Sequence, residues 1–439
     1  MAMKSKSVVL LITIILSWMN FSGFSQQSQV TKLQTRLGEQ LFRDARFSAP
    51  QGDLPASCST CHLLDEDPQG LRPYADFFNR SWISYRSASP QRFELRNSPG
   101  LFDVAAQPRL HYDGEFASLE DLVIGTFAGR PMGWLPSEKN EALAQLQKVV
   151  LQDSNYRTLF RSAYDVEVEK LERDAIVRLV ARAVADFMRT LRSKLNSPYD
   201  QFVQLNGLPA KVNAGESPTQ FAERLLARLR DLEASNTLKS PSGFTPQAVR
   251  GLKLFYSSGN CVTCHAPPYF TDYSYHNLGI SQVEYDLVFG EGAFAAMSIP
   301  DSSLAQRPND RYRQFPVKDK PGEVDLGHWN FIDLKSSTLR CANESDNQLL
   351  VRMVGAMKTP GLRHLAYTYP YMHNGAYATV ESSLRELQRL SDMAREGKVR
   401  SADAELLKIQ LHDADIAPLA AFLQTLNEDL KRNIQQANK

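Results

Sequence analysis

The sequence predicts an all-α protein that is built from two similar domains with long irregular loops. Apolar residues recur at helical spacing near both ends of the chain, and signals for β-hairpins are weak throughout. One pattern, C-x-x-C-H, occurs twice, at 58–62 and at 261–265. A Gly-x-x-Leu-Phe sequence precedes it both times, beginning at Gly38 and at Gly251. We therefore expect one local unit to occur twice.

The repeated pattern is the attachment signature of a c-type haem. Each cysteine sulfur can form a thioether to a haem vinyl group, and the adjacent histidine can give the iron an imidazole nitrogen. A zinc site would have to bring both patterns together, and a thioredoxin-like site would need a βαβ pattern, which we do not find. Two such patterns arise by chance in about one chain in a million of this composition. The sequence thus predicts two covalently bound haem c groups, held by Cys58, Cys61 and His62 and by Cys261, Cys264 and His265.

Composition describes an ordinary soluble protein. The 439 residues are 43% hydrophobic and 23% charged, which is enough for two domains with good cores. A formal net charge of +1 gives no indication of a nucleic-acid partner or of binding to a membrane surface. Four of the five cysteines lie in the repeated patterns, so Cys341 is left over and no disulfide framework is expected.

The N-terminus predicts export. Lys4 and Lys6 precede an apolar run from Val8 to Trp18, and small residues follow near Ser25. This arrangement is typical of a secretory signal peptide, which we assign to residues 1–25. The apolar run is short for a bilayer span. We therefore expect a periplasmic protein with no stable membrane insertion after cleavage.

Helical spacing and capping residues predict the order of the elements. The expected helices cover about 31–43, a segment after Ser118, 138–152, 168–195, 217–234, a segment from Thr245, 379–396 and 414–430. Stretches at 65–110 and 267–347 show little periodicity and are long for ordinary loops, so we interpret them as covering a cofactor. The segment 236–246 is rich in Ser, Thr, Pro and Gly and is taken as a linker, which gives domains at 26–236 and 237–439.

Several further motifs carry a resemblance. These are Leu95-Arg96-Asn97-Ser98-Pro99, Tyr112-Asp113-Gly114-Glu115, Phe270-Thr271-Asp272, His276-Asn277-Leu278-Gly279, Lys358-Thr359-Pro360-Gly361-Leu362-Arg363 and Tyr369-Pro370-Tyr371-Met372-His373-Asn374-Gly375. With the two haem patterns they resemble the bacterial di-haem cytochrome c peroxidases and their MauG-type relatives, in a longer-chain subgroup, over most of residues 35–430. The resemblance implies two cytochrome c-like haem domains, the first peroxidatic and the second for electron transfer.

The resemblance also implies a reaction. Hydrogen peroxide would bind the first iron opposite His62, and electrons would come from the second haem with Tyr112 as a stepping point between them. Plain packing is an equally good interpretation of Tyr112. The donor would be a small periplasmic redox protein, or a side chain of a protein substrate. No histidine lies between His62 and His111, so the sixth position of the first iron is expected to be open, with His111 as the alternative ligand.

A calcium ion between the domains is a further implication of the resemblance. The family holds it with an asparagine side chain and with backbone oxygens of a T-x-P turn. The matching positions here are Asn97, Thr368 and Pro370, all present. Oxygen ligands suit the hard Ca²⁺ ion.

Two departures from the family pattern concern the irons. The positions of the usual acid–base glutamine and glutamate are Leu122 and Pro131, so Glu120, Asp121 or Arg130 would have to substitute, unless they are ordinary surface charges. The usual second ligand of the second iron is replaced by Leu387, which cannot bind iron. The remaining possibilities are Met372, His373, Met393, a residue of the 280–345 insertion, or a five-coordinate iron.

Two other functions stay open at this point. A di-haem electron carrier without substrate chemistry would need both irons saturated by protein ligands, which the missing histidine argues against. A haem protein that uses O₂ would suit an apolar face at Leu122.

Overall fold

The structure is a computed structural model that describes residues 31–50, 55–62, 96–301, 307–308, 310–335 and 338–429. The predicted signal peptide and the segment 63–95 lie outside these residues. Helices dominate, which confirms the all-α prediction. They are α1 (Lys32–Arg43), α2 (Cys58–Cys61), α4 (Leu119–Phe127), α5 (Lys139–Gln152), α6 (Ser154–Tyr164), α7 (Arg173–Met188), α8 (Pro198–Asn206), α9 (Pro218–Ala234), α10 (Pro246–Phe255), α11 (Ile280–Phe289), α12 (Ala293–Ala296), α13 (Asp346–Arg352), α14 (Val380–Arg395) and α15 (Asp413–Gln424).

Most helices begin where their capping residues predict. The Ser118 hydroxyl accepts a hydrogen bond from the backbone N–H of Asp121 at 3.0 Å, and Ser217 and Thr245 cap α9 and α10 in the same way. The helices that were not predicted are α2, α6, α8, α11, α12 and α13. The expected helix at 168–195 is shorter, because a 3₁₀ turn at Val168–Lys170 precedes α7 and the helix ends at Met188.

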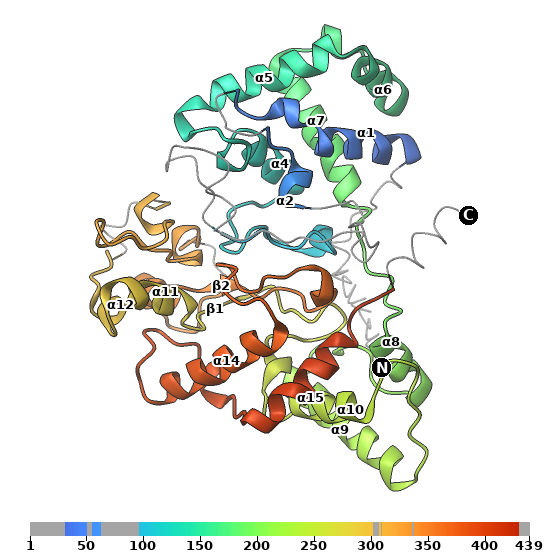
Figure 1. Ribbon diagram of the computed structural model, residues 1–439, viewed down its shortest axis with the longest axis vertical. Coiled ribbons are helices and arrows are strands. Elements are labelled where there is room, and N and C mark those ends of the chain that lie inside the picture. Colours follow the sequence, from blue (N-terminus) through green and yellow to red (C-terminus); the bar gives the residue numbers. More distant parts are fainter. Residues whose placement is uncertain are drawn as a thin grey trace, which may run out of the picture.

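The first core lies in the upper half of Figure 1, where α1 and α7 cross. Gly38 on α1 makes this crossing close: a Cβ atom there would lie 2.1 Å from the backbone oxygen of Ala183. Leu37, Leu41 and Phe42 are buried beside it. The glycine of the first Gly-x-x-Leu-Phe sequence is therefore required by helix packing.

The second core repeats this arrangement in the lower half of Figure 1, where α10 crosses α15. A Cβ atom on Gly251 would lie 1.9 Å from the backbone oxygen of Pro418. The first core ends at Leu191 and the second begins at Tyr199, so α8 and α9 pack with the C-terminal half. The cores thus divide the chain earlier than the predicted boundary at 236/237, because the apolar faces of α8 and α9 are buried against α10 and its neighbours.

A third, smaller core corrects our interpretation of residues 267–347 as an irregular cover. Phe294, Tyr312 and Trp329 are buried in it, together with residues of α13. This insertion contains α11 and α12 and lies beside the two main halves in Figure 1. A short antiparallel pair, β1 (Tyr275–His276) with β2 (Met357–Lys358), frames its two ends. The insertion is therefore a packed unit.

Contacts between the halves converge on the segment around Tyr112. The backbone N–H of Lys358 donates to the Tyr112 carbonyl at 2.7 Å, and the Asn97 N–H donates to the His373 carbonyl at 2.8 Å. These bonds place Tyr112 against β2 and Asn97 against the segment at His373. Among the described residues, no helix has both the length and the apolar character needed to cross a bilayer.

Candidate haem sites and the contact between the halves

The second C-x-x-C-H pattern opens onto a cavity of about 330 Å³. Helix α10 delivers the chain to a 3₁₀ turn at Cys261–Thr263, and Cys261, Cys264 and His265 all line the cavity. The His265 Nδ1 atom lies 2.8 Å from the carbonyl oxygen of Phe270. A hydrogen bond from Nδ1–H to this oxygen leaves Nε2 as the ligating nitrogen. Burial lowers the pKa of His265, which favours the neutral imidazole that an iron needs.

The wall of this cavity suits a flat apolar macrocycle. Val380, Leu384 and Leu387 line it from one face of α14, and Leu419 and Leu423 line it from α15. These side chains present hydrocarbon surface beside the cysteine and histidine donors, so the residues present fit a covalent haem c.

The lining of this cavity shows which of the possible second ligands of the second iron lie close to it. Met372 and His373 line it, and so does Leu387 at the family's ligand position. Met393 does not, and its sulfur accepts a hydrogen bond from Arg389 at 2.9 Å. Of the 280–345 insertion, Ile280 reaches the cavity. This geometry weakens the case for Met393 as a ligand.

The first C-x-x-C-H pattern forms the one-turn helix α2, which packs against α1. The backbone N–H of His62 donates to the Cys58 carbonyl at 2.9 Å, and the His62 ring centroid lies 6.2 Å from that of Phe42. Cys58 packs against the first core. The donors thus have the same order as in the second half, where the pattern forms a 3₁₀ turn in place of an α-helix. The segment that follows them, 63–95, lies outside the described residues.

The predicted acid–base residues occupy different settings. Glu120 on α4 forms an ion pair with Arg189 at 2.6 Å, and Arg189 also binds Asp186 at 2.9 Å. This network joins α4 to the end of α7, so Glu120 has a clear structural task. Arg130 lies in the 3₁₀ turn after α4, and Leu122 is buried in the first core.

Tyr112 and His111 both line the cavity of the second half. The Tyr112 ring centroid lies 6.4 Å from that of His373. The His111 Nδ1 atom lies 3.2 Å from a Glu115 carboxylate oxygen, so one of its ring nitrogens is already engaged.

Two of the three predicted calcium residues, Asn97 and Pro370, are in contact across the halves. The Asn97 side chain is buried, and its Nδ2 lies 2.6 Å from the Pro370 carbonyl oxygen. Its Oδ1 atom is buried without a hydrogen-bond partner in the structure. Because the two ends of an amide are assigned from their contacts, the opposite orientation would put two oxygens side by side. This arrangement fits a hard cation.

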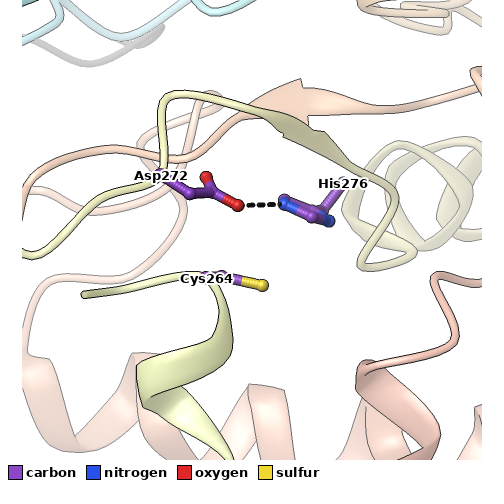
Figure 2. Close-up of side chains that lie close together, drawn as sticks. All are labelled: Cys264, Asp272 and His276. Carbon is purple, nitrogen blue, oxygen red and sulfur yellow. Dashed lines mark hydrogen bonds and ion pairs between the residues drawn. The ribbon is translucent and has the colours of Figure 1, made fainter. Parts of the chain in front are cut away.

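An acidic cluster beside the second motif was not predicted. His276 donates from Nδ1 to Asp403 at 2.7 Å and from Nε2 to Asp272 at 2.9 Å. Figure 2 shows His276 and Asp272 next to Cys264. Burial alone would lower the pKa of His276, but its hydrogen bonds to the two carboxylates raise it. Both nitrogens are occupied and Cys264 belongs to the haem pattern, so the group is an ion-pair clamp at the haem cavity.

A second acidic group, at the contact between the halves, is also neutralised by protein. Asp113 and Glu115 lie near His111, which resembles a cation site. However, Arg96 binds Asp113 at 2.6 Å and Arg313 binds Glu115 at 2.8 Å. These guanidinium groups supply the positive charge that a metal ion would otherwise bring.

Comparisons with known proteins agree with this geometry. The family described as di-haem cytochrome c peroxidase matches residues 32–207. The cytochrome-c peroxidase IdrP2 of Pseudomonas sp. (strain SCT) is 24% identical over 396 residues, covering 90% of this chain and 81% of that protein. The methylamine utilization protein MauG of Methylophilus methylotrophus is 23% identical, covering 91% and 83%. The crystal structure of the di-haem peroxidase BthA from Burkholderia thailandensis E264 superposes with a TM-score of 0.56 at 20% identity, covering 91% and 87%. This similarity confirms a fold of two cytochrome c-like domains.

Proposed function

This chain is a distant member of the di-haem cytochrome c peroxidase and MauG family, and from that premise we propose that it reduces hydrogen peroxide at its first haem. Each turnover would consume two electrons and two protons and release two molecules of water. The electrons would pass through the second haem. The observation that carries the proposal is that Tyr112 of the first half lines the haem cavity of the second half.

The haems would be held by the two repeated patterns. Cys58, Cys61 and His62 would hold the first, and Cys261, Cys264 and His265 the second. A bound haem supplies an iron that accepts a peroxide oxygen and exchanges single electrons. The protein supplies the axial imidazoles and excludes water from the second cavity through the apolar faces of α14 and α15.

Electron transfer between the halves needs a fixed contact. The Lys358 N–H donates to the Tyr112 carbonyl at 2.7 Å, and Tyr112 is one of the residues that line the cavity. We propose that Tyr112 is the stepping point between the haems. The engagement of His111 by Glu115 supports an open sixth position on the first iron, since a ligating His111 would have to leave this partner.

Polarisation of the peroxide at the first haem is proposed for the loop after α4. Glu120 is bound to Arg189, which makes it a weaker candidate than the sequence suggests. We therefore propose Arg130 as the residue that polarises the peroxide, because a guanidinium stays charged at every physiological pH.

A calcium ion is proposed between the halves. Asn97 Oδ1 and the carbonyl oxygens of Thr368 and Pro370 would bind it, and the short contact between the Asn97 amide and the Pro370 carbonyl oxygen supports this assignment. The ion would stiffen the contact that carries Tyr112. We further propose that the protein is exported to the periplasm, where a small redox protein, or a side chain of a protein substrate, supplies the electrons.

Electron paramagnetic resonance of the ferric protein tests the function. We expect a high-spin signal that disappears when one equivalent of hydrogen peroxide is added. His62→Ala should lose this response, whereas His265→Ala should keep the high-spin signal of the first haem. Two low-spin signals that peroxide does not change, in oxidised and in half-reduced protein, would show an electron carrier instead. Stable O₂ binding to the ferrous protein without a peroxide reaction would show an O₂-using protein.

A further inference from the structure

Lys358 and Arg363 line the cavity of the second half, and they differ in how their charge is balanced. Arg363 is almost fully buried, and its guanidinium binds both carboxylate oxygens of Asp200, at 2.8 and 2.9 Å. It also donates to the Pro268 carbonyl at 2.6 Å. The positive charge of Arg363 is therefore neutralised within the protein.

The positive charge of Lys358 is not neutralised by a carboxylate in this way. Its side chain is 7% exposed, and its Nζ donates to the side-chain oxygen of Gln107 and to the carbonyl oxygen of Arg109, which are both neutral. Asp113, the carboxylate whose charge acts on it, is already bound to Arg96. Within the described part of the chain, no carboxylate forms an ion pair with Lys358.

An ammonium group in this position is costly to keep charged. Burial lowers the pKa of Lys358 to about 7. A buried charge normally has a partner of opposite sign, because its lost hydration must be replaced. The cavity that Lys358 faces is the one in which we expect a haem, and a haem carries two propionate carboxylates.

We propose that Lys358 forms an ion pair with a propionate of the haem attached at Cys261 and Cys264. The inference rests on the proposed haem in this cavity and deepens the proposed function. Gln107 and the Arg109 carbonyl belong to the first half, so they hold the ammonium group at the contact between the halves. Lys358 is thus a positioning residue that joins the second haem to the backbone of Tyr112.

The ion pair has an electrochemical consequence. Reduction of ferric haem adds one negative charge to the haem, and a nearby fixed positive charge favours this step. Lys358 should therefore raise the midpoint potential of the second haem and help it collect electrons from the external donor. Loss of the charge should lower that potential.

Spectroelectrochemistry and resonance Raman spectroscopy of the full di-haem protein test this inference. Lys358→Gln should lower the midpoint potential of the second haem and shift the propionate bending band. Lys358→Arg should restore both, because arginine keeps the charge. Lys398→Gln is the matched control, since this lysine is exposed on the same half and paired with Glu396. It should change neither reading.

Unchanged potential and Raman band in Lys358→Gln would overturn the inference. If that variant does not accumulate, the wild type and Lys358→Arg are compared between about pH 6 and pH 9. If Lys358 is ion-paired, the midpoint potentials of the wild type and of Lys358→Arg change with pH in parallel. If Lys358 has no counter-ion, the two midpoint potentials diverge above about pH 7. A separate measurement of haem content tests whether each chain binds two haems. Failure of the proposed haem is therefore distinguishable from failure of the ion pair with Lys358.

Discussion

Arg96 and Asp325 join the first half of the chain to the insertion through a bidentate ion pair. The arginine Nε and Nη2 atoms each lie 2.6 Å from a carboxylate oxygen of Asp325. The remaining nitrogen, Nη1, binds Asp113 at the same distance. The two carboxylates are almost fully buried, so this arginine neutralises two charges that water does not reach.

Removal of this arginine should be strongly destabilising. Arg96→Met would leave Asp113 and Asp325 buried with less positive charge, which costs about 3–5 kcal/mol. Arg46→Met is the control, because Arg46 also binds two aspartates but its side chain is 54% exposed, and its loss should cost less than about 1 kcal/mol. Denaturant unfolding of both variants measures the difference. Equal losses would contradict a special role for the buried pair.

The His276 clamp should make stability depend on pH. Its pKa is raised by the hydrogen bonds to Asp272 and Asp403, against the opposing effect of burial. A raised histidine pKa contributes stability that is complete below the unfolded value of about 6.5 and is lost as the pH rises towards the folded value. The wild type should therefore exceed His276→Gln in free energy of unfolding by more at pH 6 than at pH 9.

The control for this experiment is His412→Gln, since His412 is exposed. Thermal or denaturant unfolding at both pH values gives the comparison. A difference between wild type and His276→Gln that is the same at both values would show that the clamp acts without its charge.

The two helix crossings should not accept even one methyl group. Gly38→Ala and Gly251→Ala would each place a Cβ atom against backbone oxygen, so one helix must move, at a cost of about 1–3 kcal/mol or more. Both variants should also attach less haem, because the moved helix leads into the C-x-x-C-H pattern. Gly397→Asn is the control, since open space surrounds Gly397 and asparagine tolerates its positive φ. Unfolding curves and haem content measure the effect.

Leu387→Met tests which wall of the cavity faces the second iron. If α14 faces the open side of the haem, the new sulfur should bind iron and raise the midpoint potential. The near-infrared charge-transfer band of a methionine-bound ferric haem detects this bond. Leu384→Met, one helical turn away on the same face, is the matched control. An unchanged spectrum in Leu387→Met would assign the second ligand position to another wall.

Local signals in the sequence predicted most helices and both haem patterns. The N-caps at Ser118, Ser217 and Thr245 are examples, because a cap needs one side chain and a neighbouring backbone N–H. The repeated Gly-x-x-Leu-Phe was noticed, but its reason, the approach of a second helix from far along the chain, was visible in the structure alone.

Features that depend on distant partners were missed. Glu120 looked available for catalysis until Arg189 was found beside it, 69 residues later. His276 and Asp403 are 127 residues apart, and no local pattern connects them. The third core was missed because its aromatic residues are scattered among turn formers, without the regular spacing that marks a helix.

The glycine crossing has a consequence for the division of labour between the two irons. Each C-x-x-C-H pattern is preceded by a helix that is held at a similarly close approach to a second helix. If one iron is reactive and the other a relay, as we propose, the difference must therefore come from outside these similar helix crossings. The two haems would then differ through the residues on the side of each haem away from its attached histidine, and through the insertion. Among its described residues, the first half has no counterpart of this insertion.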